Sequence, residues 1–526
     1  MASVLFLTIF LHLALASISQ KPLSSQNEYG PSTSSAIENA NLIFNAIHSS
    51  MRQWGSSIQH NGMSFFPAYV PQGTLLYHGH GTPNRVTGIE WLAFEIQHAE
   101  MFAVNVTLRK RGEYLGKPFT ADDGYFWDLR NEPPVHVLGL AGQDPHQDPL
   151  ELELRPGYLH IYQTTRPLKL LYLDGMSAAK CDFGPMDTQD ILLLNFTLNK
   201  FADRQRAQQL CELAQDWGVE GFIRMECGFE LIKCNFSEGL DFISHKQRPE
   251  RDEPGAYNTM ILLDFVREIG NRYDGIDGGR VELDYSSMVS AFFYPTNLSN
   301  PEQDPSQSIL PRLVESDKEV LERIKSDLGD ALRRSKRHIG FDWQGVADMI
   351  VKRFAARLEF MATNPLQEMV LSQVNVMLNL FVDYGASEAQ DPVMACALHY
   401  LKPILPSTEQ DRLIEAAFKT VTHRICSTLF EVRRLLFAKE KGEGTEELED
   451  TGSAVDLIRG LNKWLDWSDW KVCGQCGLDE VCFIAVFPFG TAEDHYSPHC
   501  VNNTEISSRI GHKESNYWKP RNIYGA

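Results

Sequence analysis

The spacing of apolar residues divides the chain into two long stretches of different character. Between residues 61 and 300, short apolar runs alternate with turn residues, and two stretches have helical periodicity, which predicts a mixed α and β domain. Between residues 301 and 438, apolar residues recur every three or four positions, which predicts amphipathic helices. Four such stripes are Val320, Leu321, Ile324, Leu328 and Leu332; Ile350, Phe354, Leu358 and Met361; Val370, Val374, Met377, Leu378 and Phe381; and Leu413, Phe418, Val421, Ile425 and Leu429.

These patterns predict an α+β N-terminal domain with a mixed sheet, an all-α domain and a small Cys-rich end. A capping box at Ser316 and Glu319 is expected to begin the first helix of the all-α domain. The predicted divisions are a signal peptide at 1–16, a leader and short helix at 17–60, the α+β domain at 61–300, the helical domain at 301–438, a charged linker at 439–453 and the Cys-rich segment at 454–526.

The first 16 residues predict export. Their apolar run is short for a membrane span, which needs about 20 residues, and it ends in Ala14-Leu15-Ala16, a pattern that signal peptidase accepts. No later stretch predicts a transmembrane helix, and the C-terminus carries no lipid-anchor signal. The sequence therefore predicts a secreted, extracellular protein without a membrane anchor.

Cysteine content and charge agree with export. Ten cysteines in an exported chain predict disulfides, although the sequence does not determine their pairing. The net charge of −20 argues against nucleic acid as a partner, because binding to phosphates depends on Lys and Arg. Five sequons predict N-glycosylation at surface positions: Asn105, Asn195, Asn235, Asn297 and Asn502.

Candidate chemistry begins in an apolar run that leads into His78-Gly79-His80. On a strand, both histidines project to the same face, and Gly79 permits close approach of a ligand to the backbone. Residues 90–103 then read as a strand that runs into a helix. Two further strands are predicted on either side of a turn at Arg166-Pro167, and a strand pair is predicted within residues 218–235, with Glu230 in its last strand.

The order of these motifs over residues 61–240 resembles the ADP-ribosyltransferase-like fold. The resemblance implies an NAD-dependent transferase or NAD glycohydrolase, in which His78 and Gly79 hold the dinucleotide and Trp91 stacks on nicotinamide. Glu230 would stabilise the positive charge that develops at the sugar carbon. The chain departs from the family pattern at Trp91, where a hydroxylated aromatic residue is expected, and at His80, where Ser or Thr is common. The implied cleft requires His78 and Glu230 to lie about 10 Å apart or less.

Three other interpretations of these residues remain open. Glu230 could form an ion pair with Arg224. His78 and His80 could bind zinc in a metal-dependent hydrolase, together with His98 and an acidic residue such as Asp122 or Asp123. The chain could also be a non-catalytic secreted protein that binds an extracellular protein partner; its oligomeric state is not indicated. Ser177-x-x-Lys180 matches an acyl-transfer motif, but a turn with hydrogen-bonding side chains is the favoured interpretation.

Overall fold

The structure is a computed structural model, and it describes most of the chain between residues 29 and 518. The described residues are 29–110, 113–114, 150–195, 202–249, 259–270, 272, 274–276, 278–302, 310–337, 340–363, 366–385, 391–440, 447–509 and 517–518. The predicted signal peptide at 1–16 lies outside these residues, as do Asp122 and Asp123.

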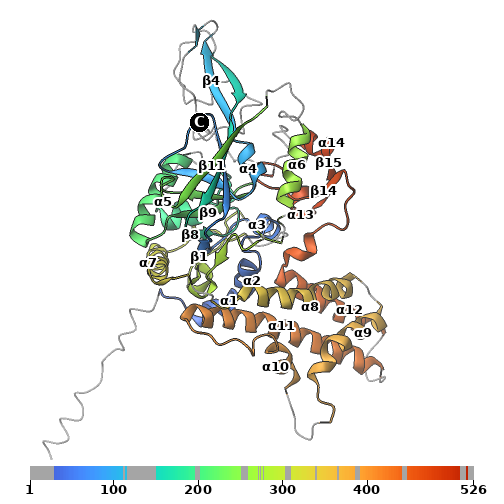
Figure 1. Cartoon of the computed structure of the whole chain (residues 1–526). Helices are drawn as coiled ribbons and strands as arrows, with labels where there is room; N and C mark the ends of the chain where they lie inside the picture. The colour runs from blue at the N-terminus through green and yellow to red at the C-terminus, as the bar shows by residue number, and fades with distance from the viewer. Residues whose placement is uncertain are drawn as a thin grey trace, which may run out of the picture.

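A ten-stranded, mixed sheet forms the centre of the N-terminal half (Figure 1). Its strands are β1 (Ser64–Val70), β2 (Leu75–His80), β3 (Glu90–Ala93), β7 (Tyr158–Thr164), β8 (Leu168–Leu173), β9 (Gly221–Met225), β10 (Phe229–Lys233), β11 (Leu240–Gln247), β12 (Glu282–Leu283) and β13 (Val289–Ser290). They lie in the order β11-β7-β2-β3-β10-β9-β8-β1-β12, and β13 also pairs with β1. Strands β8 and β9 run parallel, whereas the other neighbours run antiparallel. The predicted mixed sheet is thus confirmed.

The strands on either side of Arg166-Pro167 form as predicted, but they do not pair with each other. Strand β7 lies between β2 and β11, whereas β8 lies between β1 and β9. The pair β9 and β10 forms an antiparallel hairpin, as predicted. The difference arises because partner choice for a buried strand depends on which apolar faces meet in the core, which a local pattern does not contain.

Shorter elements surround the sheet. A separate three-stranded sheet comprises β4 (Val104–Lys110), β5 (Glu113–Tyr114) and β6 (Leu150–Pro156), and β4 extends to the top of the view in Figure 1. The other elements of this half that bear on the site are α4 (Ile96–Glu100), η2 (Thr188–Leu193), α5 (Asp203–Trp217), α6 (Thr259–Gly270), η3 (Tyr285–Ser287) and η4 (Ala291–Phe293).

The C-terminal half is helical, as predicted, and it shares a core with the N-terminal half. Its helices are α7 (Lys318–Arg334), α8 (Trp343–Thr363), α9 (Gln367–Leu378), η5 (Asn379–Phe381), α10 (Pro392–Ala397), α11 (Glu409–Glu440), α12 (Glu447–Leu465) and η6 (Ser468–Lys471). All four predicted apolar stripes are buried, except that Leu321 and Phe381 are partly buried. One hydrophobic cluster runs from the sheet into these helices.

The predicted short helix near the N-terminus belongs to this shared core. It forms three helices, α1 (Thr33–Glu38), α2 (Ala40–His48) and α3 (Gln53–Ile58). Helix α2 packs on α8 and α11, and the ring of Phe44 lies 4.7 Å from the ring of Phe418. Residues near the start of the described chain therefore connect the sheet to the helical half.

Two local predictions about helix ends were wrong. Helix α7 begins at Lys318, and the Ser316 hydroxyl donates a hydrogen bond to the Asn297 carbonyl oxygen. The predicted capping box therefore does not form. Both described ends of the predicted linker at 439–453 are helical: α11 continues to Glu440, and α12 includes residues 447–453. In α12, the helix propensity of the Glu-rich sequence outweighs Gly452.

Two disulfides hold the Cys-rich end together, as the sequence predicted for a small disulfide-bonded segment. They join Cys473 to Cys482 and Cys476 to Cys500. This segment contains β14 (Glu480–Phe483) and β15 (His499–Asn502), which pair antiparallel, together with α13 (Ala492–Tyr496) and α14 (Asn503–Arg509). Two more disulfides lie elsewhere, Cys211–Cys234 and Cys396–Cys426, whereas Cys181 and Cys227 are buried thiols.

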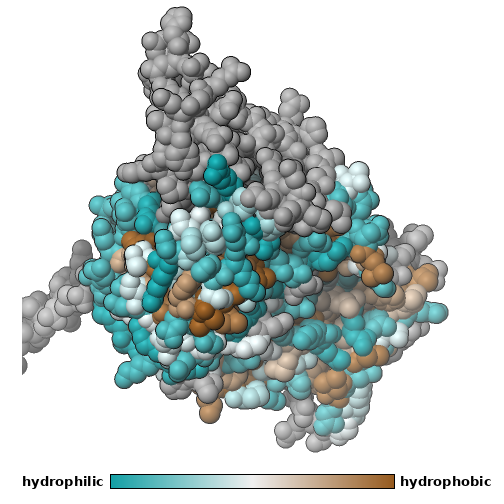
Figure 2. All heavy atoms as spheres, turned by 45° about the horizontal axis from the view of Figure 1, so that its top comes forward, coloured by the Kyte–Doolittle hydropathy of each residue, from teal (hydrophilic) through white to brown (hydrophobic). Residues whose placement is uncertain are grey.

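The visible surface of the described residues is mostly hydrophilic, with apolar residues in separate patches (Figure 2). Within the described part of the chain, no helix is both long enough and apolar enough to cross a membrane.

We expect the Cys396–Cys426 disulfide to stabilise the helical half. It links α10 to α11 across 30 positions of the sequence, and both cysteines are buried. Replacing both by Ser should lower the free energy of unfolding by about 3 kcal/mol, because the open chain gains conformational entropy when unfolded. Urea titration of the variant and the parent protein checks this, and equal unfolding midpoints would contradict it.

Candidate functional site

The sheet register places His78 and Glu230 on opposite faces. Glu230 on β10 pairs with Ala93 on β3, and Ala93 pairs with Tyr77 on β2. Directly paired residues project to the same side of an antiparallel sheet, and the next residue along a strand projects to the other side. His78 follows Tyr77, so the predicted cleft between His78 and Glu230 does not form.

Helix α4 confirms which side Glu230 faces. Ala99 on α4 packs with Ala93 and Tyr77, which project from the same face as Glu230. The carboxylate charge of Glu230 also acts on His98 of the same helix. Trp91 lies two residues before Ala93 on β3, so it too projects from the Glu230 face.

His78 belongs to a buried cluster of histidines on the other face. Its ring lies 5.7 Å from that of His80 and 6.0 Å from that of His160, its partner on β7. The Nδ1 atom of His78 lies 2.7 Å from the Trp91 carbonyl oxygen, which places its proton on Nδ1. Burial lowers the pKa of His78 to about 3, so the ring is neutral at neutral pH.

The remaining predicted positions have packing partners. A Cβ atom on Gly79 would lie 2.3 Å from the Ala99 carbonyl oxygen, so this glycine is required for the approach of α4 to β2. The guanidinium of Arg204 lies over the indole ring of Trp91, 6.0 Å from its centre. We find no role for Gly79 in ligand binding, because α4 occupies the space next to it.

The predicted zinc site is not assembled. His78 and His80 share a face, as expected, but His98 is on α4 and lies on the opposite side of the sheet. Among the described residues, the group with metal-like spacing is Cys473, Cys476 and Cys500, and these three form disulfides.

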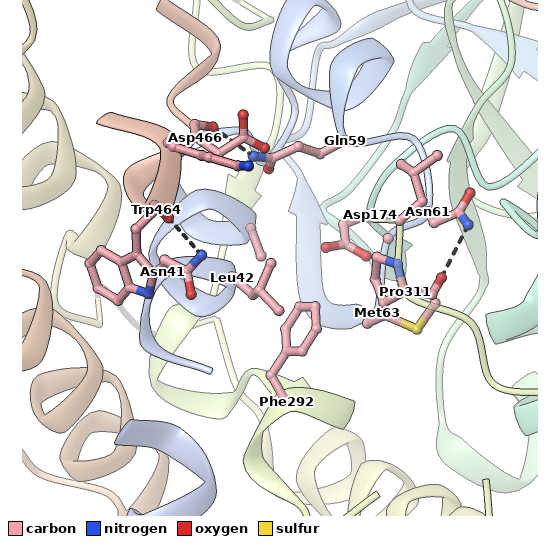
Figure 3. Close-up of a pocket in the computed structure, with 14 residues that line it drawn as sticks. Asn41, Leu42, Gln59, Asn61, Met63, Asp174, Phe292, Pro311, Trp464 and Asp466 are labelled. Atoms are coloured by element: carbon pink, nitrogen blue, oxygen red, sulfur yellow. Dashed lines mark hydrogen bonds between the residues drawn. The ribbon is translucent and has the colours of Figure 1, made fainter. Parts of the chain in front are cut away.

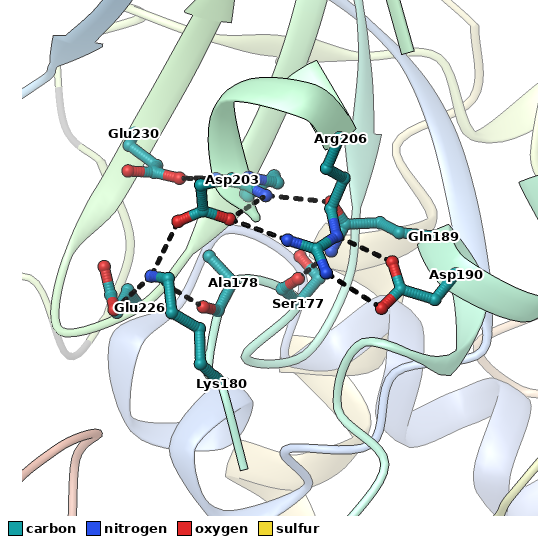
Figure 4. A network of polar contacts seen from close by, with 10 residues as sticks. Ser177, Ala178, Lys180, Gln189, Asp190, Asp203, Arg206, Glu226 and Glu230 are labelled. Carbon is teal, nitrogen blue, oxygen red and sulfur yellow. Dashed lines mark hydrogen bonds and ion pairs between the residues drawn. The ribbon is translucent and has the colours of Figure 1, made fainter. Parts of the chain in front are cut away.

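Glu230 instead belongs to a buried network of charged side chains (Figure 4). Arg224 on β9 donates two hydrogen bonds to Oε1 of Glu230, from Nε at 2.9 Å and from Nη2 at 2.5 Å. The alternative prediction of an Arg224–Glu230 ion pair is thereby confirmed. Lys180 follows β8, and its Nζ lies 2.7 Å from Oε1 of Glu226 and 2.9 Å from Oδ2 of Asp203. Within this network, Lys180, Arg224, Glu226 and Glu230 are each less than 10% exposed.

Helix α5 contributes the other half of the network. Asp203 is the first residue of α5, where the positive end of the helix dipole favours a carboxylate. Arg206 is fully buried, and its Nη1 lies 2.9 Å from Oδ1 of Asp203 while its Nε lies 2.7 Å from Oδ1 of Asp190. The network thus joins the ends of β8, β9 and β10 to the start of α5.

Among the described residues, the network contains four carboxylates, Asp190, Asp203, Glu226 and Glu230, but three permanent cations, Lys180, Arg206 and Arg224. His98 adds no charge, because burial lowers its pKa. Burial raises the pKa of Glu226 to about 7. Burial would raise the pKa of Asp203 as well, but the charges of Lys180 and both arginines outweigh it and lower that pKa to about 2. Near neutral pH, Glu226 therefore carries a proton in part of the molecules, which relieves the surplus negative charge.

Sequence reasoning found part of this network. The Ser177 hydroxyl donates a hydrogen bond to the Leu173 carbonyl oxygen at 3.0 Å, and the Lys180 ammonium group forms ion pairs with Asp203 and Glu226. The predicted turn with hydrogen-bonding side chains is therefore confirmed, and Ser177 and Lys180 do not form an acyl-transfer pair. Asp203, Arg206 and Glu226 were missed. Arg224 lies within the apolar run of β9 and Glu226 directly follows it, and these charged residues were the available signal.

The sequons differ in exposure. Asn195 and Asn297 are exposed, whereas Asn105, Asn235 and Asn502 are partly buried. The predicted surface position is therefore clearest at the first two.

Comparison with known proteins places this chain in a family. The model of the YPL277C N-terminal domain matches residues 33–132 and 142–254. The uncharacterized protein YPL277C of Saccharomyces cerevisiae is 35% identical over 386 residues, which cover 61% of this chain and 75% of that protein. The chain belongs to the YPL277C family.

A second relative of this YPL277C-family chain comes from the same yeast. The uncharacterized protein YOR389W is 26% identical over 531 residues, covering 85% of this chain and 81% of that protein. No solved structure matches the chain. The region matched by the YPL277C N-terminal domain includes the whole charged network, from Lys180 to Glu230.

Proposed function

We propose that this protein is a secreted enzyme that cleaves or transfers a glycosidic bond at the charged network, with Glu226 as general acid and Glu230 as the charge-stabilising carboxylate. The observation that carries the proposal is that, among the described residues, carboxylates outnumber cations by one in a buried site. Such a site keeps one carboxyl group protonated beside ionised ones, which is the pairing that acid-catalysed glycoside chemistry requires.

The open oxygen of Glu230 supports this role. Both hydrogen bonds from Arg224 go to Oε1, and among the described residues no donor contacts Oε2. Arg224 thus fixes the carboxylate while leaving one oxygen for a substrate. A fixed carboxylate lowers the barrier when positive charge develops at a sugar carbon.

Export is the second element of the proposal. Four disulfides among the described residues are typical of an oxidising compartment. The apolar N-terminal segment and the exposed sequons Asn195 and Asn297 point the same way.

NAD belongs to the proposed substrate class, but fewer residues would bind it than the resemblance implies. Trp91 and Glu230 project from the same face and keep the roles that the resemblance implies, whereas His78 on the opposite face has none. The two kinds of substrate make different demands on Glu226. An alkoxide leaving from an O-glycoside needs a proton, whereas nicotinamide leaves NAD as a neutral molecule and needs none.

The test uses the purified full chain with a panel of nitrophenyl glycosides and with NAD. We expect turnover of one substrate class, and Glu230→Gln should lower kcat for either class. Glu226→Gln should lower kcat by about 10²- to 10⁴-fold for an O-glycoside but leave nicotinamide release from NAD largely intact. With an O-glycoside, activity should fall as the pH rises through about 7, because the acid must be protonated.

Glu282→Gln is the matched control, since Glu282 is exposed and pairs with Arg337 away from the network. It should retain parental activity. Glu226→Gln should also stay folded, because the parental side chain already carries a proton near neutral pH. No turnover of any panel member, or parental rates in Glu230→Gln, would overturn the proposal.

A further inference from the structure

A cavity of about 420 Å³ lies between the sheet and the helical half, apart from the charged network. Helix α2, the segment at 59–63 and the end of β8 line one part of it, and the end of α12 and the segment at 310–311 line another. Figure 3 shows Asp174 and Asn61 on one side and Asn41 and Trp464 on the other, with Leu42 and Phe292 between them. A ligand in this cavity would contact both halves of the molecule.

Asp174 is the charged group buried in the cavity wall. Asp174 directly follows β8 in the chain and is 6% exposed. Its Oδ1 accepts a hydrogen bond from the Ser64 backbone N–H at 2.8 Å. No Lys, Arg or His among the described residues forms an ion pair with it. Lys463 also lines the cavity, but its side chain is exposed to solvent. The Asp174 carboxyl group thus has no counter-ion among the described residues.

Two amide side chains in the cavity wall have an oxygen that can accept a hydrogen bond. Asn41 donates its Nδ2 to the Trp464 carbonyl oxygen at 2.9 Å, and Gln59 donates its Nε2 to the Asp466 carbonyl oxygen at 3.2 Å. These carbonyls fix the orientation of both amides, because only the nitrogen can donate. No donor among the described residues contacts Oδ1 of Asn41 or Oε1 of Gln59. The oxygen of each amide is therefore an acceptor for a ligand, and the second N–H of each amide is a donor.

We propose that the cavity binds a small organic ammonium ion, a primary amine on a compact apolar body, with the ammonium group on Asp174. An ammonium group offers three donors and no acceptor, which complements the Asp174 carboxyl group and the oxygens of Asn41 and Gln59. Leu42, Met63 and Phe292 provide the apolar surface for the body of the ligand. The cavity volume lies in the range of small-molecule sites. This site is independent of the glycosidic chemistry proposed above.

The protonation of Asp174 agrees with this assignment. Burial raises the pKa of Asp174 to about 7, so part of the population is neutral when the cavity holds no cation. An ammonium group beside the carboxyl favours its charged form. Binding of an amine near pH 7 is therefore coupled to release of a proton from Asp174.

The experiment compares 2-phenylethylamine with its neutral isostere 2-phenylethanol by calorimetry on the full chain. We expect the amine to bind at least tenfold more tightly than the alcohol at pH 7. Titrations in buffers of different ionisation enthalpy should show proton release on amine binding. Asp174→Asn keeps the shape of the side chain and should abolish both the preference and the proton release, whereas Asp317→Asn, at an exposed helix cap, should change neither.

A second variant keeps the test informative if Asp174→Asn does not fold. Asn41→Lys introduces an ammonium group from a half-buried position on α2 and should prevent amine binding by occupying the site. Equal affinity for the amine and the alcohol, absence of amine binding at millimolar concentration, or unchanged amine binding in Asn41→Lys would each overturn the proposal.

Discussion

Acidification from pH 7 to pH 4 should lower the free energy of unfolding by an amount on the order of 5 kcal/mol. Four buried histidines cause this loss: burial lowers the pKa of His78 to about 3, and those of His48, His60 and His160 to about 4. Each unit of pKa difference between the folded and unfolded states is worth about 1.4 kcal/mol. The expected loss is comparable to the whole stability of a typical domain.

The sign follows from which state takes up protons first. An unfolded histidine has a pKa of about 6.5, so between pH 6.5 and 4 the unfolded chain binds more protons and is favoured. Asp174 and Glu226 act in the opposite direction, because burial raises both pKa values to about 7 and the folded state binds their protons first. The four histidines outweigh the two carboxyl groups, so the free energy of unfolding falls on acidification.

Denaturant unfolding followed by tryptophan fluorescence at several pH values measures this effect. His78→Leu should reduce the pH dependence of stability by up to one proton, because it removes one of the four groups. His423→Gln is the matched control, since this histidine is exposed on α11 and should not alter the slope. Stability that is constant or that rises between pH 7 and pH 4 would refute the expectation.

Lys180→Met should destabilise the fold by about 3–5 kcal/mol, the usual cost of removing one partner from a buried ion pair. Its ammonium group contacts Asp203 and Glu226 directly, and its charge also acts on Glu230. Without it, the surplus of carboxylates in the network increases from one to two. Urea titration at pH 7 measures the change.

A double variant tests the charge explanation. Adding Asp203→Asn to Lys180→Met should recover part of the lost stability, because it removes an ionised carboxylate that contacts Lys180 in the same network. Arg434→Met provides the control, as it breaks an exposed pair with Glu431 and should have little effect. If the double variant is as unstable as the sum of the two single variants, packing rather than charge explains the loss.

Much of the helical half could be predicted because its signal is local. Apolar residues such as Ile324, Leu328 and Leu332 recur at the period of a helix, and that period alone assigns them to a buried face. The same applies to the strands β9 and β10, which are adjacent in the sequence and pair across a short turn. The Arg224–Glu230 ion pair was accessible for this reason, because six positions separate the two residues.

The charged network could not be predicted as a unit. Lys180, Asp203 and Glu226 come from a loop, a helix start and a strand end, and only the packing of α5 beside β9 brings them together. The cavity around Asp174 is a similar case, since Asn41 and Trp464 lie more than 400 positions apart in the chain and meet through one hydrogen bond.

The amino-acid sequence by itself determined the alternation of strands and helices, the apolar stripes and the presence of disulfides, because each depends on residues close together or on cysteine content. Only the tertiary structure decided which face of the sheet each candidate residue occupies. That outcome depends on the pairing of Tyr77 with Ala93 and of Ala93 with Glu230, and a shift of one residue in either pairing would reverse it. Strand register is fixed by the packing of the whole core, and for this reason the sequence pointed to His78 and Glu230 but not to their separation.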